Sequence, residues 1–207
     1  MFNKVYLLIT GPKSSLAKKI IKHLDKKKYS IITFDRKKLN LRNSINVKKV
    51  FSSELKLIKD KKVIFINNAF EIGPILNFRN INTNLLGPLI TANIISQSIM
   101  ISLLEKKVRN FYIINISSGA VFTKNKKLSI YTLTKNFIHN LIEYLNIEND
   151  KNFIKKKRYI NFIPPSFFSK MNQKLIRYNV LKNKKNIKKP YIVAKNLIKL
   201  IESLKWD

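Results

Sequence analysis

The sequence contains no cysteine, and its two histidines lie far apart, at positions 23 and 139. The missing cysteines exclude disulfides, thiolate metal sites and a cysteine nucleophile, and two separated histidines argue against a metal enzyme. Long apolar runs are also missing: the run at 5–10 is too short for a signal sequence, and five polar residues interrupt the stretch 89–104. We therefore expect a cytoplasmic protein that does not enter a membrane.

Acidic residues are scarce, because 11 Asp and Glu stand against 42 Lys and Arg and give a formal net charge of +31. Such a balance invites a nucleic-acid interpretation. Arginine supplies only six of the basic residues, however, and the joint excess of Lys, Asn and Ile is typical of an A/T-rich genome. We interpret most of the charge as a solvated surface. Nucleic-acid binding through the lysine-rich runs 155–158 and 182–189 is kept as the less favoured alternative.

What is present is a regular alternation of short apolar runs with amphipathic stretches, in a chain whose 207 residues suit one domain spanning 1–207. Helices are expected after Ser14 or Ser15 and at 44–59, 82–104 and 130–147. The strands are expected at 5–10, 30–34, 39–41, 63–67, 111–117 and 159–163. This order predicts an α/β fold with a doubly wound parallel sheet, Rossmann-like, of about six strands with helices on both faces and no separate substrate domain.

Small and polar residues directly follow most of the expected strands. In doubly wound sheets, ligands bind beyond the carboxyl ends of the strands, and the first strand–helix turn commonly holds a pyrophosphate. The segments placed there by the sequence are 11–17, 35–36, 67–69, 117–118 and 164–166. The sequence therefore predicts a ligand site along this edge.

Tyr131 and Lys135 are four residues apart and share one face of the helix expected at 130–147. A free tyrosine titrates near ~10, but an ammonium beside it stabilises the phenolate and lowers its pKa, which makes it a plausible general acid. Two other Tyr-x-x-x-Lys pairs occur, at 178/182 and 191/195. Only Tyr131 follows a strand that ends in Ser-Ser-Gly, with Ser118 thirteen residues before it.

These residues and motifs resemble the short-chain dehydrogenase/reductase family over nearly the whole chain. Thr10-Gly11 resembles the start of its glycine-rich turn, 67–70 resembles its Asn-Asn-Ala-Gly segment, and 84–87 is similar to the helix segment that carries its fourth catalytic residue. Pro164-Pro165 with Ser169 and Met171 resembles the Pro-Gly…Thr segment that closes over the nicotinamide. The wording of 116–120 is nearest to sepiapterin-reductase-like members.

The resemblance implies an NAD(P)(H)-dependent oxidoreductase that interconverts a carbonyl and an alcohol on a small molecule. In it, Tyr131 would exchange a proton with the substrate oxygen, Ser118 would hydrogen-bond the carbonyl, and Asn84 would hold a water in a proton relay. Lys135 would bind the nicotinamide ribose and lower the pKa of Tyr131. The implied cofactor-binding residues are Gly11, Lys13, Ser14, Ser15, Leu16, Asp35, Arg36, Asn68, Ala69, Tyr131, Lys135, Pro164 and Ser169.

Four positions depart from the family pattern. Ser15 and Ala17 stand in place of the second and third glycines of the turn, and Phe70 and Pro165 stand in place of two further glycines. A side chain at a glycine position can obstruct the approach of a pyrophosphate. The second hypothesis is therefore a protein that keeps the fold, has lost cofactor binding and acts as a scaffold or subunit.

Three further expectations concern the ligands and partners. Asp35 favours NAD, whereas Arg36 accommodates the 2′-phosphate of NADP, and the added charge of Lys13 leads us to expect NADP. Lysines in the segment 166–189 suggest an anionic substrate. The helices at 82–104 and 130–147 are apolar over more than one face, which predicts a homo-oligomer in which they pair across a dimer axis.

Overall fold

The computed structural model describes residues 4–150, 158–178, 180–181 and 186–206. Its strands form one parallel sheet in the order β2-β1-β3-β4-β5. They are β1 (Val5–Thr10), β2 (Tyr29–Phe34), β3 (Lys62–Asn67), β4 (Asn110–Ile116) and β5 (Tyr159–Phe162). The expected doubly wound α/β sheet is confirmed.

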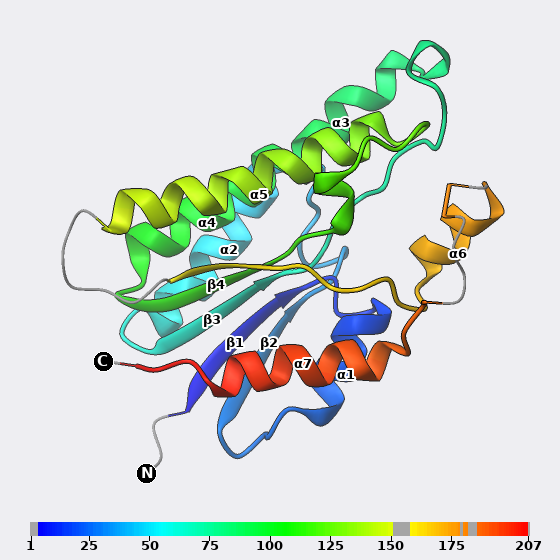
Figure 1. Cartoon of the computed structure of the whole chain (residues 1–207). Coiled ribbons are helices and arrows are strands. Elements are labelled where there is room, and N and C mark those ends of the chain that lie inside the picture. The colour runs from blue at the N-terminus through cyan, green and yellow to red at the C-terminus, as the bar shows by residue number, and fades with distance from the viewer. Residues whose placement is uncertain (1–3, 151–157, 179, 182–185, 207) are drawn as a thin grey trace.

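Helices cover both faces of the sheet (Figure 1). On one face lie α1 (Ser15–His23) and α7 (Pro190–Glu202), which pack against each other. On the other lie α2 (Ser44–Ile58), α4 (Ser96–Lys107) and α5 (Ser129–Asp150). The short helices α3 (Leu86–Ile90) and α6 (Lys170–Arg177) lie toward the carboxyl-end edge of the sheet. This layering explains why the central strands read as continuous apolar runs, because both of their faces are buried.

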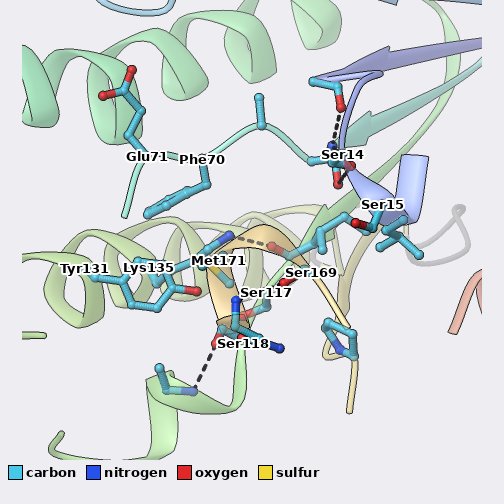
Figure 2. A pocket seen from close by; sticks show the side chains of 18 of the residues that line it. Ser14, Ser15, Phe70, Glu71, Ser117, Ser118, Tyr131, Lys135, Ser169 and Met171 are labelled. Carbon is cyan, nitrogen blue, oxygen red and sulfur yellow. Dashed lines mark hydrogen bonds between the residues drawn. The ribbon is translucent and has the colours of Figure 1, made fainter. Parts of the chain in front are cut away.

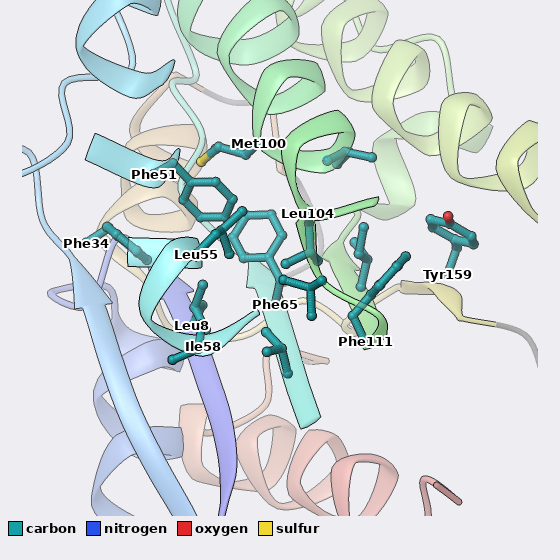
Figure 3. Close-up of a cluster of buried hydrophobic side chains, with 14 of the residues drawn as sticks. Leu8, Phe34, Phe51, Leu55, Ile58, Phe65, Met100, Leu104, Phe111 and Tyr159 are labelled. Atoms are coloured by element: carbon teal, nitrogen blue, oxygen red, sulfur yellow. The ribbon is translucent and has the colours of Figure 1, made fainter. Parts of the chain in front are cut away.

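Each face of the sheet has its own apolar core. Under α2, α4 and α5 the rings of Phe34, Phe51 and Phe65 pack in sequence, with centroids 5.4 and 5.2 Å apart (Figure 3). The opposite core joins β1, β3 and β4 to α1 and α7. Described strands number five against the expected six or so, because 39–41 forms a loop. Leu39 is nevertheless buried in the first core, which accounts for its apolar character without strand pairing.

The helix expected at 82–104 is a helical segment that spans 83–107 and contains an irregularity. It begins as a 3₁₀ turn, continues as α3, widens to a π-helical turn at Thr91–Ile95 and ends as α4. By length and composition alone this segment could cross a membrane. In the fold, however, α4 packs against α2, and the polar side chains of Asn93 and Gln97 are buried and hydrogen-bonded. We therefore assign it to the core.

The strand order reverses between β1 and β3, where successive connections leave on opposite sides of the sheet. A crevice forms at such a point outside the carboxyl ends of the strands. Gly11 directly follows β1 there with φ of +64°, and a Cβ at this position would lie 3.1–3.3 Å from Asn68 and Ala69. Glycine is thus required both by the backbone conformation and by the close approach of the loop after β3.

Candidate active site

One cavity of about 1030 Å³ runs along the carboxyl ends of the strands, from the turn after β1 to the start of α5. With a single exception, Asn84, all of the site residues expected from the sequence line it. They are Gly11, Lys13, Ser14, Ser15, Leu16, Asp35, Arg36, Asn68, Ala69, Ser118, Tyr131, Lys135, Pro164 and Ser169. Segments that are distant in the sequence thus meet at one edge of the sheet, as parallel strands require.

The turn after β1 is tied to the loop after β3 by side-chain hydrogen bonds. The Thr10 hydroxyl accepts the backbone N–H groups of Asn68 and Ala69 at 3.0 and 2.9 Å. Asn68 Nδ2 in turn donates to the Thr10 carbonyl at 2.7 Å. Ser14 caps α1, since its Oγ accepts the N–H of Ala17 at 3.1 Å. The N-terminus of α1 therefore opens onto the cavity in the orientation that binds anionic groups.

Ser15 and Ala17, which replace two glycines of the family pattern, have different surroundings. Ala17 is fully buried in the core between α1 and the sheet and is absent from the cavity lining, so its methyl group is accommodated by packing. Ser15 lines the cavity at the first residue of α1. Of these two residues, therefore, only Ser15 could obstruct a bound pyrophosphate.

Ser118, Tyr131 and Lys135 come together at the other end of the cavity (Figure 2). Ser118 begins a 3₁₀ turn after β4, and its Oγ accepts the N–H of Ala120 at 3.2 Å, which fixes the side chain. Tyr131 is only 3% exposed, and while this burial raises the pKa of its hydroxyl, the Ser118 side chain acts on the hydroxyl by lowering its pKa. A substrate oxygen placed between these two hydroxyls could accept hydrogen bonds from both.

Lys135 is buried beneath the cavity floor with 5% of its surface exposed. Its Nζ donates to the carbonyl of Ile116 at 2.6 Å and lies 3.9 Å from the centroid of the Phe70 ring (Figure 2). Within the described residues no carboxylate pairs with this ammonium. Burial lowers the pKa of Lys135 from 10.5 to about 7, because the charged form loses its hydration.

The pKa of Tyr131 is raised, which corrects the expectation that Lys135 lowers it. Burial is the larger cause, since a phenolate there would lose its water, and the hydrogen bond from Ser118 acts in the opposite direction but is weaker. The ammonium of Lys135 instead faces the Ile116 carbonyl and the Phe70 ring. Without ligands, Tyr131 is therefore a protonated phenol at neutral pH.

Asn84 does not join this group, which corrects its assignment to the catalytic set. It lies exposed in the 3₁₀ turn before α3, where its backbone N–H donates to Asn82. A buried asparagine of the same helical segment, Asn93 in the π-helical turn, contacts the loop that lines the site. Its Oδ1 accepts the N–H of Glu71 at 2.9 Å and its Nδ2 donates to the Glu71 carbonyl at 2.7 Å.

Asn93 was not identified from the sequence. The segment 84–87 was chosen because its residue types resemble the family motif, and residue types alone do not show which position is buried. The amide of Asn93 also donates to Thr134 at 3.4 Å, so it joins the loop that carries Phe70 to the helix that carries Lys135. One signal was available in the sequence. Asn93 and Gln97 are polar residues four apart in an otherwise apolar helix, and such a pair facing a core needs partners.

Charged residues gather at the end of the cavity near β2. The Asp35 carboxylate accepts the N–H groups of Lys37 and Lys38, both at 3.0 Å, and pairs with Lys13 at 3.4 Å. These contacts hold the pKa of Asp35 below its usual value, with the hydrogen bond from Lys38 contributing most. Glu71 is shared by Arg36 and Arg42 at 2.8 and 2.6 Å. Both carboxylates are therefore already engaged by cations.

Three comparisons place this architecture among known proteins. No family model matches the chain, and no curated protein matches its sequence. Solved structures do match. The 3-ketoacyl-(acyl-carrier-protein) reductase of Brucella melitensis, complexed with NADH, superposes with a TM-score of 0.75 at 18% identity over 96% of this chain and 90% of that one. The chain has the fold of the short-chain dehydrogenases/reductases.

Two further structures carry the same family name. A short chain dehydrogenase family protein from Francisella tularensis gives a TM-score of 0.74 at 16% identity, with 97% of this chain and 92% of that chain covered. A short chain dehydrogenase from Burkholderia cenocepacia, in complex with NADP, gives 0.73 at 12% identity, with 97% and 91% covered. The narrower resemblance to sepiapterin-reductase-like members stays a prediction.

Proposed function

We propose that this protein is an NADP(H)-dependent oxidoreductase of the short-chain dehydrogenase/reductase family, which interconverts a carbonyl and an alcohol on a small molecule. The observation that carries the proposal is the meeting of Tyr131, Ser118 and Lys135 in a cavity that continues to the turn after β1. Structures with the same fold supply the support for the cofactor, since one is described with NADH and another with NADP.

The cavity suits a dinucleotide at both ends. At the first end, the capped N-terminus of α1 opens onto the cavity beside the turn at Gly11, whose positive φ and close contact with the loop after β3 fix the backbone of the turn. At the second, Lys135 lies under the surface that a nicotinamide ribose would occupy. When bound, the cofactor supplies or accepts the hydride. Tyr131, Ser118 and Lys135 then have the remaining tasks of orienting the substrate and moving a proton.

Each residue of the site has a task that its surroundings permit. The protonated Tyr131 hydroxyl donates its proton to the substrate oxygen during carbonyl reduction, and Ser118 hydrogen-bonds the same oxygen. Lys135, with a pKa of about 7, changes its protonation state easily near neutral pH, and its Nζ faces the Ile116 carbonyl and the Phe70 ring in the ligand-free site. Asn93, rather than Asn84, holds the loop at Glu71 against the helices, from a buried position that does not itself line the cavity.

The charges near β2 favour NADP over NAD. A free ribose 2′-hydroxyl needs a carboxylate to accept its hydrogen bond, but Lys13 and two backbone N–H groups already surround Asp35. Arg36 lines the cavity with 76% of its side chain exposed, and Glu71 contacts it at one nitrogen. In the described part of the chain its remaining donors have no partner, so they can bind a 2′-phosphate.

A titration with both dinucleotides tests the cofactor proposal. We expect saturable binding of NADPH at micromolar concentration, with NADH at least tenfold weaker, measured by nicotinamide fluorescence or calorimetry. Arg36→Gln should remove most of that difference, because it deletes a charged partner of the phosphate worth about 1.5–3 kcal/mol. Arg79→Gln, which removes the same charge from an exposed position outside the cavity lining, is the matched control.

The same titration decides between this proposal and a scaffold or subunit without cofactor. Binding of neither dinucleotide would contradict the oxidoreductase function. In that case Phe70→Gly should be titrated next, because the Phe70 ring lies over Lys135 at 3.9 Å. Recovery of binding in that variant would identify the ring as the obstruction, whereas no recovery would support the scaffold.

We also propose that the protein forms a homodimer through the outer face of α5. Large apolar side chains are exposed there at helical spacing, including Leu133 at 63%, Phe137 at 48% and Tyr144 at 65%. A monomer rarely exposes such a row of apolar side chains.

The alternative of nucleic-acid binding rests on the lysine-rich runs at 155–158 and 182–189. These runs lie largely outside the described residues.

Light scattering at increasing protein concentration should give the mass of a dimer. Leu133→Lys should shift the population to monomer, because it buries a charge in an isologous interface, where each substitution counts twice. Leu57→Lys makes the same change at a residue of α2 that is 78% exposed and should leave the mass unchanged. A wild-type protein that stays monomeric at high concentration would contradict the dimer.

A further inference from the structure

The two ends of the cavity differ sharply in polarity. Its charged lining residues lie on the β1–β3 side and comprise Lys13, Asp35, Arg36, Lys37 and Glu71. At the Tyr131 end, Lys135 is the only charged lining residue in the described part of the chain. A substrate that lies beyond the nicotinamide would therefore meet a surface without the charges that surround the opposite end.

Apolar side chains form the Tyr131 end. Tyr131 belongs to a cluster with Leu128 and Leu175, against which Phe70, Met171 and Leu181 are packed. All five of these apolar residues also line the cavity. They come from the loop after β3, the start of α5 and the segment around α6, so the enclosure is built by the tertiary fold.

α6 separates its apolar and basic residues. Met171 and Leu175 are four apart on the face that lines the cavity, while Lys170, Lys174 and Arg177 are exposed and outside the lining. Ser169 caps this helix by accepting the N–H of Asn172 at 3.0 Å, which fixes its rotation. The described lysines of this segment therefore face solvent, while Lys182, Lys184 and Lys185, on which the expected anionic substrate also rests, lie outside the described residues.

Two amide side chains at this end already donate hydrogen bonds within the protein. Asn172 Nδ2 donates to the carbonyl of Phe167 at 2.8 Å, and Asn125 Nδ2 donates to the hydroxyl of Thr123 at 2.6 Å. Among the described residues, a carboxylate or phosphate placed between these side chains would lose its hydration without gaining a new charged partner. A carbonyl oxygen, in contrast, would meet the hydroxyls of Tyr131 and Ser118.

We infer that the Tyr131 end of the cavity takes a neutral carbonyl compound with an apolar body, such as an aryl or alkyl ketone. Its oxygen meets Tyr131 and Ser118, and its apolar body lies against Leu128, Met171 and Leu175. This inference rests on the proposed function and names the substrate class for the same site. It replaces the anionic substrate suggested by the lysine content of 166–189.

Binding of a matched pair of ligands tests the inference without turnover. The pair is 2-acetylnaphthalene and 6-acetyl-2-naphthoate, measured by calorimetry at 150 mM salt, on the protein alone and with NADP⁺. We expect the neutral ketone to bind at least tenfold more tightly than the acid. The chain carries a formal charge of +31, so general electrostatics favours the acid, and a preference for the ketone must come from the cavity.

Variants on α6 locate the binding. Leu175→Lys should weaken the ketone at least tenfold and strengthen the acid, whereas Leu175→Met, which preserves the volume and polarity, should change neither by more than about threefold. Met171→Lys provides the same test at a less buried position, should Leu175→Lys fail to fold. Leu57→Lys, at an exposed residue of α2 outside the cavity lining, should leave ketone binding unchanged.

Three outcomes would overturn the inference. The acid could bind as tightly as the ketone or more tightly, neither ligand could bind, or ketone binding could be insensitive to both α6 lysine variants. These outcomes are independent of the cofactor titration. If neither dinucleotide binds but the ketone binds the protein alone in an α6-dependent way, the proposed function fails and the apolar site stands. If NADPH binds and the ketone does not, the substrate class alone is wrong.

Discussion

Tyr131→Phe should reduce turnover of any carbonyl substrate by about 10²–10⁴-fold, the usual contribution of a positioned general acid. The substitution removes one hydroxyl and leaves the ring in place. Since Tyr131 is buried against Phe70, with ring centroids 5.5 Å apart, packing is preserved. The phenylalanine ring loses only the interaction of the hydroxyl with Ser118, so the stability should change by no more than about 1 kcal/mol.

Steady-state rates of NADPH oxidation with saturating substrate provide the measurement. Dinucleotide binding should be retained in the variant, so a lower rate reports the proton transfer and not the loss of cofactor. Tyr178→Phe belongs to another Tyr-x-x-x-Lys pair and is exposed and outside the cavity lining, so it should keep full activity. Undiminished turnover in Tyr131→Phe would rule out the proposed mechanism.

Lys135→Met should make the ligand-free protein more stable at pH 7 and less dependent on pH. The pKa of Lys135 is lowered from 10.5 to about 7 in the folded protein, whereas the unfolded chain keeps the ordinary value. Between these two values the unfolded state binds more protons, so the free energy of unfolding of the wild type rises with pH across that window. Methionine fills the same space and does not titrate.

The advantage of Lys135→Met should therefore shrink by about 3 kcal/mol between pH 7 and pH 9.5, at 1.36 kcal/mol per pKa unit. Urea denaturation of both proteins across this range measures it, and the difference between them cancels the other titrating groups. Lys195→Met, at an exposed position of α7, should show no pH-dependent difference. A constant difference for Lys135→Met would mean that the Phe70 ring and the Ile116 carbonyl keep the buried lysine protonated.

The contact between Lys135 and Phe70 is a tertiary contact that the Tyr-x-x-x-Lys motif does not predict. Tyr131 and Lys135 follow from their four-residue spacing on a helix, which is local geometry. The ammonium of Lys135 contacts the Phe70 ring and the Ile116 carbonyl only when the loop after β3 packs against α5. The direction of the Tyr131 pKa depends on how much water this packing excludes, and no spacing encodes that quantity.

The two asparagines illustrate the same limit for residue assignment. Asn84 lies in the sequence that resembles the family motif, yet it is exposed, while Asn93 is buried and bonded to Glu71. The π-helical turn at Thr91–Ile95 contributes, because it changes which residues of this helix face the sheet. Leu39 is a further case, since its apolar character reflects burial under α2 rather than a strand.

By itself, the sequence determined the alternation of strands and helices, the caps, the glycine after β1 and the Ser-Tyr-Lys set, because propensity, periodicity and turn chemistry act over a few residues. The tertiary structure decided which polar groups are desolvated, which asparagine is buried against the loop at Glu71 and which face of α6 lines the cavity. These features depend on contacts between segments that are tens of residues apart, and the energies of burial and hydrogen bonding are set only when those segments meet.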